Sequence, residues 1–362
     1  MTGSPRLVTE LKEEHSEKGR AATVAGVPIS VVRWGFVFFV AASVAGFLGA
    51  FVISGDWTAD FQSFLRFNPI WFVPAAGLMV MDWVGGGLRF RALVTPQDAK
   101  ISLLKCIQVA TAGTAMGYLT PASTGAGPAN IYGLMRAGLP LGRAAAVNAA
   151  SFLANVIFLS AAGLTVWGLG LSQQIADIRL PVANLSAAAL FRWTALVFGS
   201  GVGVIVLFAV LPGIARAIIR RTMGSDNPRI ERVLHHFDEL HAGLLVYWKN
   251  GKLSFLAAIL SGGVQFSSRF LLGWVILKGF VAAAPFVQVT LLHIVLQYLI
   301  YVMPTPGGTG GGEVIAAVIM APFMPAAMVV PYTAVWRIFL TYGTVAMGAS
   351  IMLNWLGKDG AR

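Results

Sequence analysis

The stretch YVMPTPGGTG, at residues 301–310, interrupts an apolar run with two prolines and three glycines. The stretch YLTPASTGAG, at residues 118–127, matches it at Tyr, Pro, Gly and Gly with a constant offset of 183 residues, about half the chain. In each copy proline ends one helix, glycine permits a tight turn, and the N–H groups that open the next helix can face an anion. The pair predicts two helical hairpins in an internal repeat. The alternative is that both clusters are only kinks in packed membrane helices.

The composition of the 362-residue chain is that of a membrane protein. Hydrophobic residues make up 57% of it and charged residues 11%, against roughly 25% charged residues in an average soluble domain. Such a chain has too little polar surface to cover a soluble globule, and it is too apolar to be intrinsically disordered. The net charge of +11 is expected on cytoplasmic loops that contact anionic lipids, and not on a nucleic-acid-binding surface.

An all-α membrane domain is predicted over residues 34–356, between an N-terminal tail at 1–33 and a short tail at 357–362. Apolar runs of about 20 residues, the length that crosses a bilayer, predict six full spans. The basic loop 213–252 divides the domain into halves at 34–212 and 253–356. The six spans are expected at 34–53, 70–88, 144–169, 190–212, 253–278 and 331–356.

The distribution of basic residues predicts the orientation. Lys and Arg cluster at both ends of segment 102–143 and in the loop 213–252, and cytoplasmic loops of membrane proteins carry such an excess. The residues expected on the cytoplasmic side at the first end are Arg89, Arg91, Lys100 and Lys105. We therefore expect a multi-pass protein of the inner (plasma) membrane with both termini in the cytoplasm. Segment 102–143 must then enter and leave on the cytoplasmic side, and segment 285–330 on the opposite side. The two turns are thus predicted to be opposed re-entrant hairpins in an inverted repeat, a geometry typical of transporters.

Ionisable groups inside apolar spans are costly and often mark function. One arginine is predicted to bind a lipid phosphate bidentately, while Glu313 holds or releases it. Alternatively, Glu313 forms a purely structural pair with Arg337 or Arg269. Asp82 is expected as a structural partner for one of these arginines. The candidate substrate-binding residues are Pro121, Gly125, Gly127, Arg269, Pro304, Gly307, Gly308, Gly310, Glu313 and Arg337. The candidate supporting residues are Asp82, Tyr118, Gln265 and Tyr301.

Neither a metal site nor a cofactor is expected. His235, His236 and His241 lie in an amphipathic stretch without HExxH order, which favours an interfacial helix over a metal cluster. The sequence contains no Walker A motif, DxD pair or GxSxG. ATP coupling and the standard catalytic sites that these motifs indicate are therefore not expected.

The sequence resembles a known family around both turns. PTPGGTGGGE at 304–313, followed by Trp336-Arg337, resembles the C-terminal signature of the lysylphosphatidylglycerol synthase transmembrane (flippase-like) family. Pro121, Gly125 and the run YGLMRAGLPLGRA at 132–144 resemble its N-terminal signature. The resemblance implies a bacterial or archaeal inner-membrane protein that moves aminoacylated or related lipids between leaflets. Residues 126–130 and 151–155 depart from the family pattern because they are uncharged, and no aminoacyl-transferase domain is expected in this chain.

We therefore expect a lipid flippase without enzymatic activity that moves a phospholipid or a related amphiphile. Its expected partners are the lipid substrate and anionic membrane lipids, and no nucleic acid. Two further possibilities are left open: a homo-oligomer, and a partner enzyme that synthesises the lipid. One alternative is a membrane enzyme that acts on a lipid-linked substrate with Glu313 as base. The others are an assembly subunit with purely structural hairpins and an ion-coupled transporter of small solutes.

Overall fold

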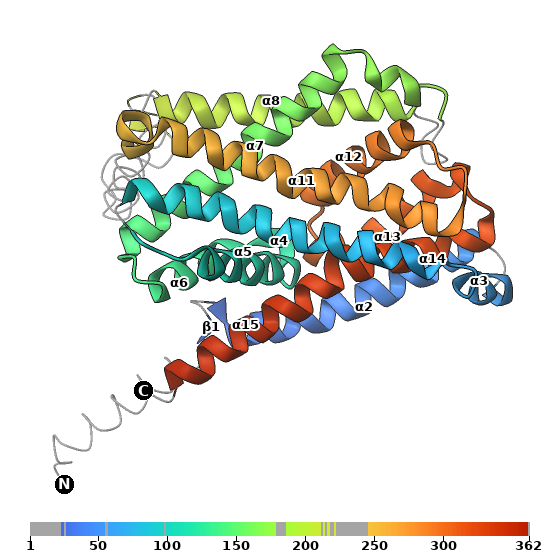
Figure 1. The fold of residues 1–362 in the computed structure, drawn as a ribbon, viewed down its shortest axis with the longest axis horizontal. Coiled ribbons are helices and arrows are strands. Elements are labelled where there is room, and N and C mark those ends of the chain that lie inside the picture. The colour runs from blue at the N-terminus through green and yellow to red at the C-terminus, as the bar shows by residue number, and fades with distance from the viewer. Residues whose placement is uncertain are drawn as a thin grey trace, which may run out of the picture.

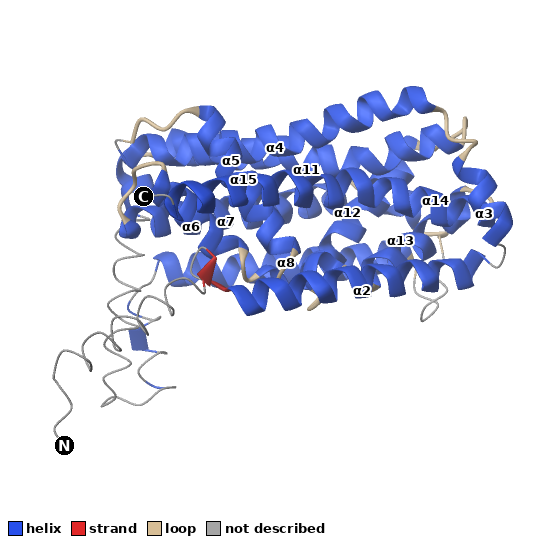
Figure 2. Ribbon diagram, turned by 90° about the horizontal axis from the view of Figure 1, so that it is seen from below, coloured by secondary structure: helices blue, strands red, loops and turns tan. Residues whose placement is uncertain are grey.

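The computed structural model describes residues 23–24, 27–54, 57–97, 99–178, 186–210, 213, 216–217, 221 and 245–360. These residues form a bundle of helices laid along one long axis (Figures 1 and 2). Its strands, within the described residues, are a two-residue antiparallel pair, β1 (Thr23–Val24) and β2 (Val27–Pro28). The predicted all-α membrane fold is confirmed.

Five stretches of the described residues are long and apolar enough to cross a membrane. Apolar runs drive these helices, because a helix satisfies its own backbone hydrogen bonds where no water is present. A further helix, α8 (Ala187–Val210), is 24 residues long and matches the predicted span 190–212. The five stretches hold α2 (Ile29–Ser54), α4 (Phe72–Val94), α7 (Leu141–Gly168), α11 (Lys252–Phe280) and the continuous run of α14 (Ala326–Arg337), a π-helix (Ile338–Tyr342) and α15 (Gly343–Gly360).

Two pairs of half-length helices lie between these long helices. The first pair is α5 (Leu103–Tyr118) with α6 (Ala126–Arg136), and the second is α12 (Phe286–Val302) with α13 (Gly311–Met320). Figure 1 shows the first pair in one half of the long axis and the second pair in the other half. The remaining short elements are α3 (Trp57–Phe64) and single helical turns at Pro69–Trp71, Thr95–Gln97, Leu171–Ile175 and Ala321–Phe323.

The last long helix begins earlier than predicted. The chain is extended at Met324 (φ −153°, ψ 157°), and α14 starts at Ala326 immediately after Pro325. Pro331, the predicted start, is buried inside α14. A proline inside a helix removes one backbone hydrogen bond. In a membrane protein this loss is tolerated because neighbouring helices can provide partners for the freed backbone group. The predicted boundary at Pro331 is therefore wrong, and the break falls at the preceding proline.

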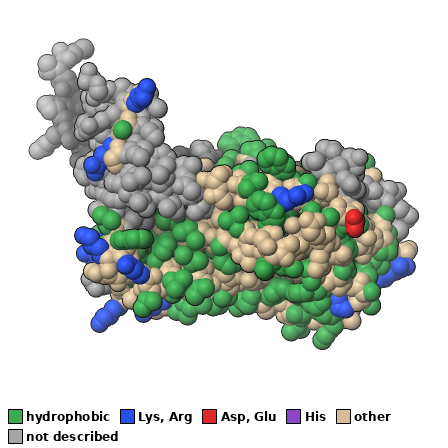
Figure 3. Space-filling view, turned by 90° about the horizontal axis from the view of Figure 1, so that it is seen from above, with side chains coloured by type: hydrophobic (Ala, Val, Ile, Leu, Met, Phe, Trp, Pro, Cys, Tyr) green, Lys and Arg blue, Asp and Glu red, His purple; other side chains and the backbone are tan. Residues whose placement is uncertain are grey.

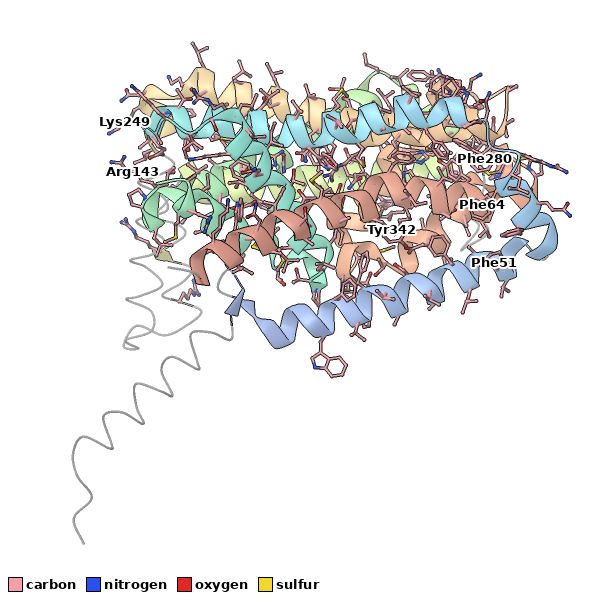
Figure 4. All side chains as sticks on the ribbon, turned by 60° about the horizontal axis from the view of Figure 1, so that its bottom comes forward. Phe51, Phe64, Arg143, Lys249, Phe280 and Tyr342 are labelled. Atoms are coloured by element: carbon pink, nitrogen blue, oxygen red, sulfur yellow. The ribbon has the colours of Figure 1, made fainter. Side chains whose placement is uncertain are left out.

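The surface of the bundle suits a bilayer. Figure 3 shows hydrophobic side chains spread over the visible face, with more Lys and Arg near one end than elsewhere. Arg143 and Lys249 lie at one end of the long axis, and Phe51, Phe64 and Phe280 lie at the other (Figure 4). Exposed large apolar side chains, which are costly in water, occur all along the helices, for example at Val52, Phe152 and Leu253.

Each pair of half-length helices is buried in its own apolar core. One core gathers residues of α11, α12, α13 and α14, and the other gathers residues of α4, α5, α6, α7 and α15. Helix α4 packs along α11 and also along α5, so it joins the two cores. The region between the cores is therefore fixed by long helices on several sides.

The two ends of the bundle should be accessible from opposite sides of the membrane. In a Cys106→Ser background, we expect Arg143→Cys and Lys249→Cys to react with a membrane-impermeant maleimide from one side. Arg66→Cys and Ala282→Cys should react from the other side, because they follow Phe64 and Phe280 at the opposite end (Figure 4). Labelling of Arg143→Cys and Lys249→Cys from different sides would contradict this arrangement.

Candidate functional site

The two predicted turns meet near the middle of the bundle. The first turn is a 3-10 turn at Pro121–Ser123 between α5 and α6, and the second is one at Pro306–Gly308 between α12 and α13. The Ala122 N–H donates a hydrogen bond to the Pro304 carbonyl at 3.3 Å. A Cβ atom added at Gly307 would lie 3.2 Å from the Tyr118 carbonyl oxygen, so the two turns are in direct contact.

The backbone geometry changes the register of the internal repeat. TPASTG at residues 120–125 is equivalent to TPGGTG at residues 305–310, an offset of 185 residues. The same hydrogen bonds recur at this offset, whereas the predicted offset of 183 matches letters but not geometry. In the first copy, these bonds join Ser123 N to Thr120 O (3.2 Å), Thr124 N to Pro121 O (3.1 Å) and Thr124 Oγ1 to Pro121 O (3.0 Å). In the second copy, they join Gly308 N to Thr305 O (3.1 Å), Thr309 N to Pro306 O (3.0 Å) and Thr309 Oγ1 to Pro306 O (2.7 Å).

The two turns differ in the residues at their left-handed positions. Gly307 and Gly308 have φ angles of 61° and 65°, and the equivalent Ala122 and Ser123 have φ angles of 48° and 56°. A residue with a Cβ atom pays about 1–2 kcal/mol in this region, whereas glycine does not. The first turn is therefore strained. It is also exposed at residues 121–124, whereas residues 306–309 are buried.

Replacing the strained residues by glycine should stabilise the protein. We expect Ala122→Gly and Ser123→Gly each to raise the free energy of unfolding by about 1 kcal/mol, because the left-handed backbone then carries no Cβ atom. Tryptophan-detected thermal unfolding in detergent measures this change. The control Ala126→Gly, at a helical position in α6, should lower stability by about 0.5–1 kcal/mol. Loss of stability in all three variants would show that the strain is absent.

A buried ion pair holds the second turn. Glu313 and Arg337 are both fully buried, and Arg337 Nη2 donates to Glu313 Oε2 at 3.2 Å. The Nε atom lies 3.1 Å from Oε1 of the same carboxylate. Nη1 donates to the Gly307 carbonyl at 3.1 Å and to Thr341 Oγ1 at 3.2 Å, and Nη2 donates to the Gly308 carbonyl at 3.0 Å. Both terminal guanidinium nitrogens therefore donate to protein acceptors, whereas Nε and Oε1 make a charge contact without a hydrogen bond.

Two glycines let this cluster assemble. A Cβ atom at Gly312 would lie 2.1 Å from Arg337 Nη2, so the guanidinium can reach the turn only past a glycine. A Cβ atom at Gly46 of α2 would lie 2.7 Å from the carbonyl oxygen of Gly310, which precedes α13. Helix α2 therefore packs directly on the second turn.

Removing both partners of the ion pair should destabilise the protein less than the sum of the two single removals. Arg337→Met should lower the free energy of unfolding by about 3–5 kcal/mol, because it leaves Glu313 as an unpaired buried charge. The double variant Glu313→Leu/Arg337→Met should lose less than the sum of the single losses. Arg337→Lys should not restore stability, because lysine lacks the planar fork that reaches both carbonyls. Unfolding curves that show strictly additive losses would contradict this coupling.

A second buried ion pair lies between the cores. Arg269 of α11 binds Asp82 of α4 bidentately, with Nε to Oδ1 at 2.8 Å and Nη2 to Oδ2 at 3.2 Å. Arg269 Nη1 donates to the Tyr301 hydroxyl at 3.2 Å. Because Tyr301 lies in the last turn of α12, just before Met303, this pair is linked to the second turn. The structure thus brings Asp82, Arg269 and Tyr301 together as one polar cluster.

Arg89 is not among the predicted site residues. It was expected among the cytoplasmic positive charges, but its side chain is 5% exposed and points into the bundle. Arg89 donates to Ser151 Oγ at 2.8 Å, to Asn155 Oδ1 at 2.7 Å and to Gln265 Oε1. The available signal was its spacing of seven residues from Asp82, which places both on one face of α4. Gln265, a predicted supporting residue, precedes Arg269 by one turn of α11 and so connects both arginines.

The remaining predicted residues belong to the turns themselves. Gly125 caps α6, and its N–H donates to Thr120 Oγ1 at 2.7 Å. Gly127 lies in the first turn of α6, where an added Cβ atom would be 3.4 Å from the Asn148 amide nitrogen. The described residues contain no group of His, Cys, Asp and Glu that could hold a metal ion. The histidines at 235, 236 and 241 lie outside the described residues.

The apolar surface, the long helices and the buried charge pairs define a multi-pass membrane protein. Residues 34–348 match the family described as the lysylphosphatidylglycerol synthase TM region, and the chain belongs to this family. A UPF0104 membrane protein from Archaeoglobus fulgidus is 23% identical over 295 residues, which cover 80% of this chain and 88% of that protein. The predicted family membership is confirmed.

Proposed function

We propose that this protein is a flippase that moves a phospholipid or a related amphiphile between the leaflets of the inner membrane. The observation that carries the proposal is the contact between the two turns, at Ala122 and Pro304. The first turn joins two half-length helices in one half of the bundle, and the second turn joins two in the other half (Figure 1). Broken helices that meet in this way are the geometry of inverted-repeat transporters, so α5–α6 and α12–α13 act as opposed re-entrant hairpins.

The exposure of the first turn supports a polar route beside it. Unsatisfied backbone groups cost several kcal/mol in hydrocarbon, so irregular backbone persists at membrane depth only where it is buried or lines a water-filled cavity. Residues 121–124 are irregular and exposed, unlike the buried residues 306–309. We infer that the first turn lines a hydrated groove. A headgroup crosses there while its acyl chains stay in the bilayer.

The buried charges then take different roles. Arg269 is the group that binds a headgroup phosphate, because a guanidinium pairs with phosphate bidentately. Asp82 holds Arg269 until the phosphate replaces it. Arg337 and Glu313 position the second turn, because phosphate binding by Arg337 would require it to leave the Gly307 and Gly308 carbonyls.

The basic end of the bundle faces the cytoplasm in this proposal, because cytoplasmic loops carry the excess of Lys and Arg. Both termini then lie on the cytoplasmic side. Anionic membrane lipids contact this end. The driving force is a gradient, the membrane potential or mass action, since the sequence has no Walker A motif.

Lipid movement in proteoliposomes tests the proposal. We expect wild-type protein to accelerate loss of fluorescence when an impermeant quencher reaches headgroup-labelled phosphatidylglycerol from the opposite leaflet. Asp82→Asn and Arg269→Gln should slow this movement about tenfold or more, because each leaves a buried group without its charge partner. The exposed control Lys105→Gln should move lipid at the wild-type rate.

Several headgroups should be compared in the same assay, including phosphatidylethanolamine and lysylphosphatidylglycerol. Failure of the wild-type protein to move any of them would refute the flippase proposal. Chemical turnover of a lipid without transport would instead support the membrane-enzyme alternative.

A further inference from the structure

Arg89 differs from the other buried arginines in the described part of the chain. Arg269 is paired with Asp82 and Arg337 with Glu313. Arg89 is equally buried, at 5% exposure, but makes no ion pair with any described residue. Its acceptors are the neutral side chains of Ser151, Asn155 and Gln265. An unpaired charge inside an apolar span is expensive, so a missing counter-charge is expected here.

Among the residues that the structure describes, no acceptor matches the remaining donors of the groups around Arg89. Arginine has no acceptor, so the oxygens of Ser151, Asn155 and Gln265 must all face the guanidinium. This leaves the hydroxyl hydrogen of Ser151 and the amide hydrogens of Asn155 and Gln265 for another partner. Arg89 Nη2 likewise donates to no residue that the structure describes. A cluster of unmatched donors around a cation is the environment that an anion requires.

The charge of the cluster indicates which anion fits. The charges of Asp82 and Arg269 cancel each other. Asp82 lies two helical turns from Arg89 along α4, and Arg269 lies one turn from Gln265 along α11. The cluster of these charged residues therefore carries one net positive charge. A phosphodiester carries one negative charge and two free oxygens, which can take one hydrogen from Arg89 Nη2 and others from the amides.

We propose that Arg89, with Ser151, Asn155 and Gln265, binds the phosphodiester of a phospholipid headgroup. The lipid source of this anion rests on the proposed function, whereas the anion site itself does not. The site lies on α4, α7 and α11, and it is separate from the two turns. A headgroup that passes between the basic end and the turns would have a binding group on its way.

Ligand-dependent unfolding of the full chain in non-ionic detergent tests this site, since a bound ligand raises the unfolding temperature. The probes are dioctanoyl phosphatidylglycerol, dioctanoylglycerol, which lacks the phosphodiester, and inorganic phosphate. We expect phosphatidylglycerol to stabilise the wild-type protein more than either other probe. Arg89→Gln should raise its apparent dissociation constant about tenfold or more. The matched control Arg91→Gln, on the same helix, should bind as the wild type does.

A second variant keeps the test decisive if Arg89→Gln fails to fold. Asn155→Asp places a carboxylate beside Arg89 and thereby supplies the missing counter-charge. We expect it to raise the unfolding temperature without lipid and to weaken the stabilisation by phosphatidylglycerol about tenfold or more. A structural role for Arg89 alone predicts the first change without the second, so an unchanged response to phosphatidylglycerol would overturn the proposal.

The other outcomes are equally clear. Equal stabilisation by dioctanoylglycerol would refute the anion site, and stabilisation by inorganic phosphate alone would refute a lipid as its source. Phosphatidylglycerol binding that depends on Arg89, together with no lipid movement in proteoliposomes, would keep this site and refute the flippase proposal.

Discussion

The rest of the structure depends on the hydrogen bonds that Arg337 donates to the second turn. A turn with two successive left-handed residues leaves carbonyl groups without helical partners, and a buried carbonyl needs a hydrogen bond. Arg337 supplies it to both Gly307 and Gly308, while Glu313 neutralises the charge that this requires. The long helix that carries Arg337 and the half-length helix that carries Glu313 are thereby fixed to the same point. That point is where the first turn makes contact through Ala122 and Pro304.

The two turns have the same backbone hydrogen bonds, but their surroundings differ. TPASTG and TPGGTG form the same local hydrogen bonds, but the second copy is buried, relaxed at its glycines and held by an arginine. The first copy is exposed, strained at Ala122 and Ser123, and has no comparable described arginine on its carbonyls. Strain of this kind persists only when surrounding structure imposes it, and it is often found where a segment has a function. The asymmetry makes the second turn the fixed partner and the first turn the adjustable one.

The sequence predicts the membrane fold well because its signals are local. Apolar runs of bilayer length locate the long helices, and Pro/Gly clusters locate both turns. The register of the repeat was wrong because Tyr118 and Tyr301 match as letters, whereas hydrogen bonding places the true equivalence at Thr120 and Thr305. The start of the last helix was wrong because a proline can occupy either the beginning or the interior of a membrane helix.

Which buried charges pair with each other depends on the tertiary structure. The sequence alone therefore could not single out these pairs in the candidate site. Asp82 was predicted as a structural partner for one of the buried arginines, which is confirmed, but a separation of 187 positions does not indicate that the partner is Arg269. Arg89 was assigned to the cytoplasmic side because basic residues near a helix end are usually solvated there. The structure shows instead that the Arg89 side chain is buried, because Ser151 and Asn155 of α7 lie against it.

The distribution of buried charge follows the same asymmetry as the turns. Around the second turn the charge is fully compensated, because Glu313 and Arg337 form a closed pair. Along α4 and α11 it is not, because Asp82 and Arg269 cancel and Arg89 is left over. A paired arginine that also donates to backbone carbonyls, as Arg337 does, is held in a single geometry. An uncompensated buried cation instead lowers its energy by acquiring an anion. The second turn is therefore held in place, whereas in our proposal the surface between α4, α7 and α11 exchanges a negatively charged ligand.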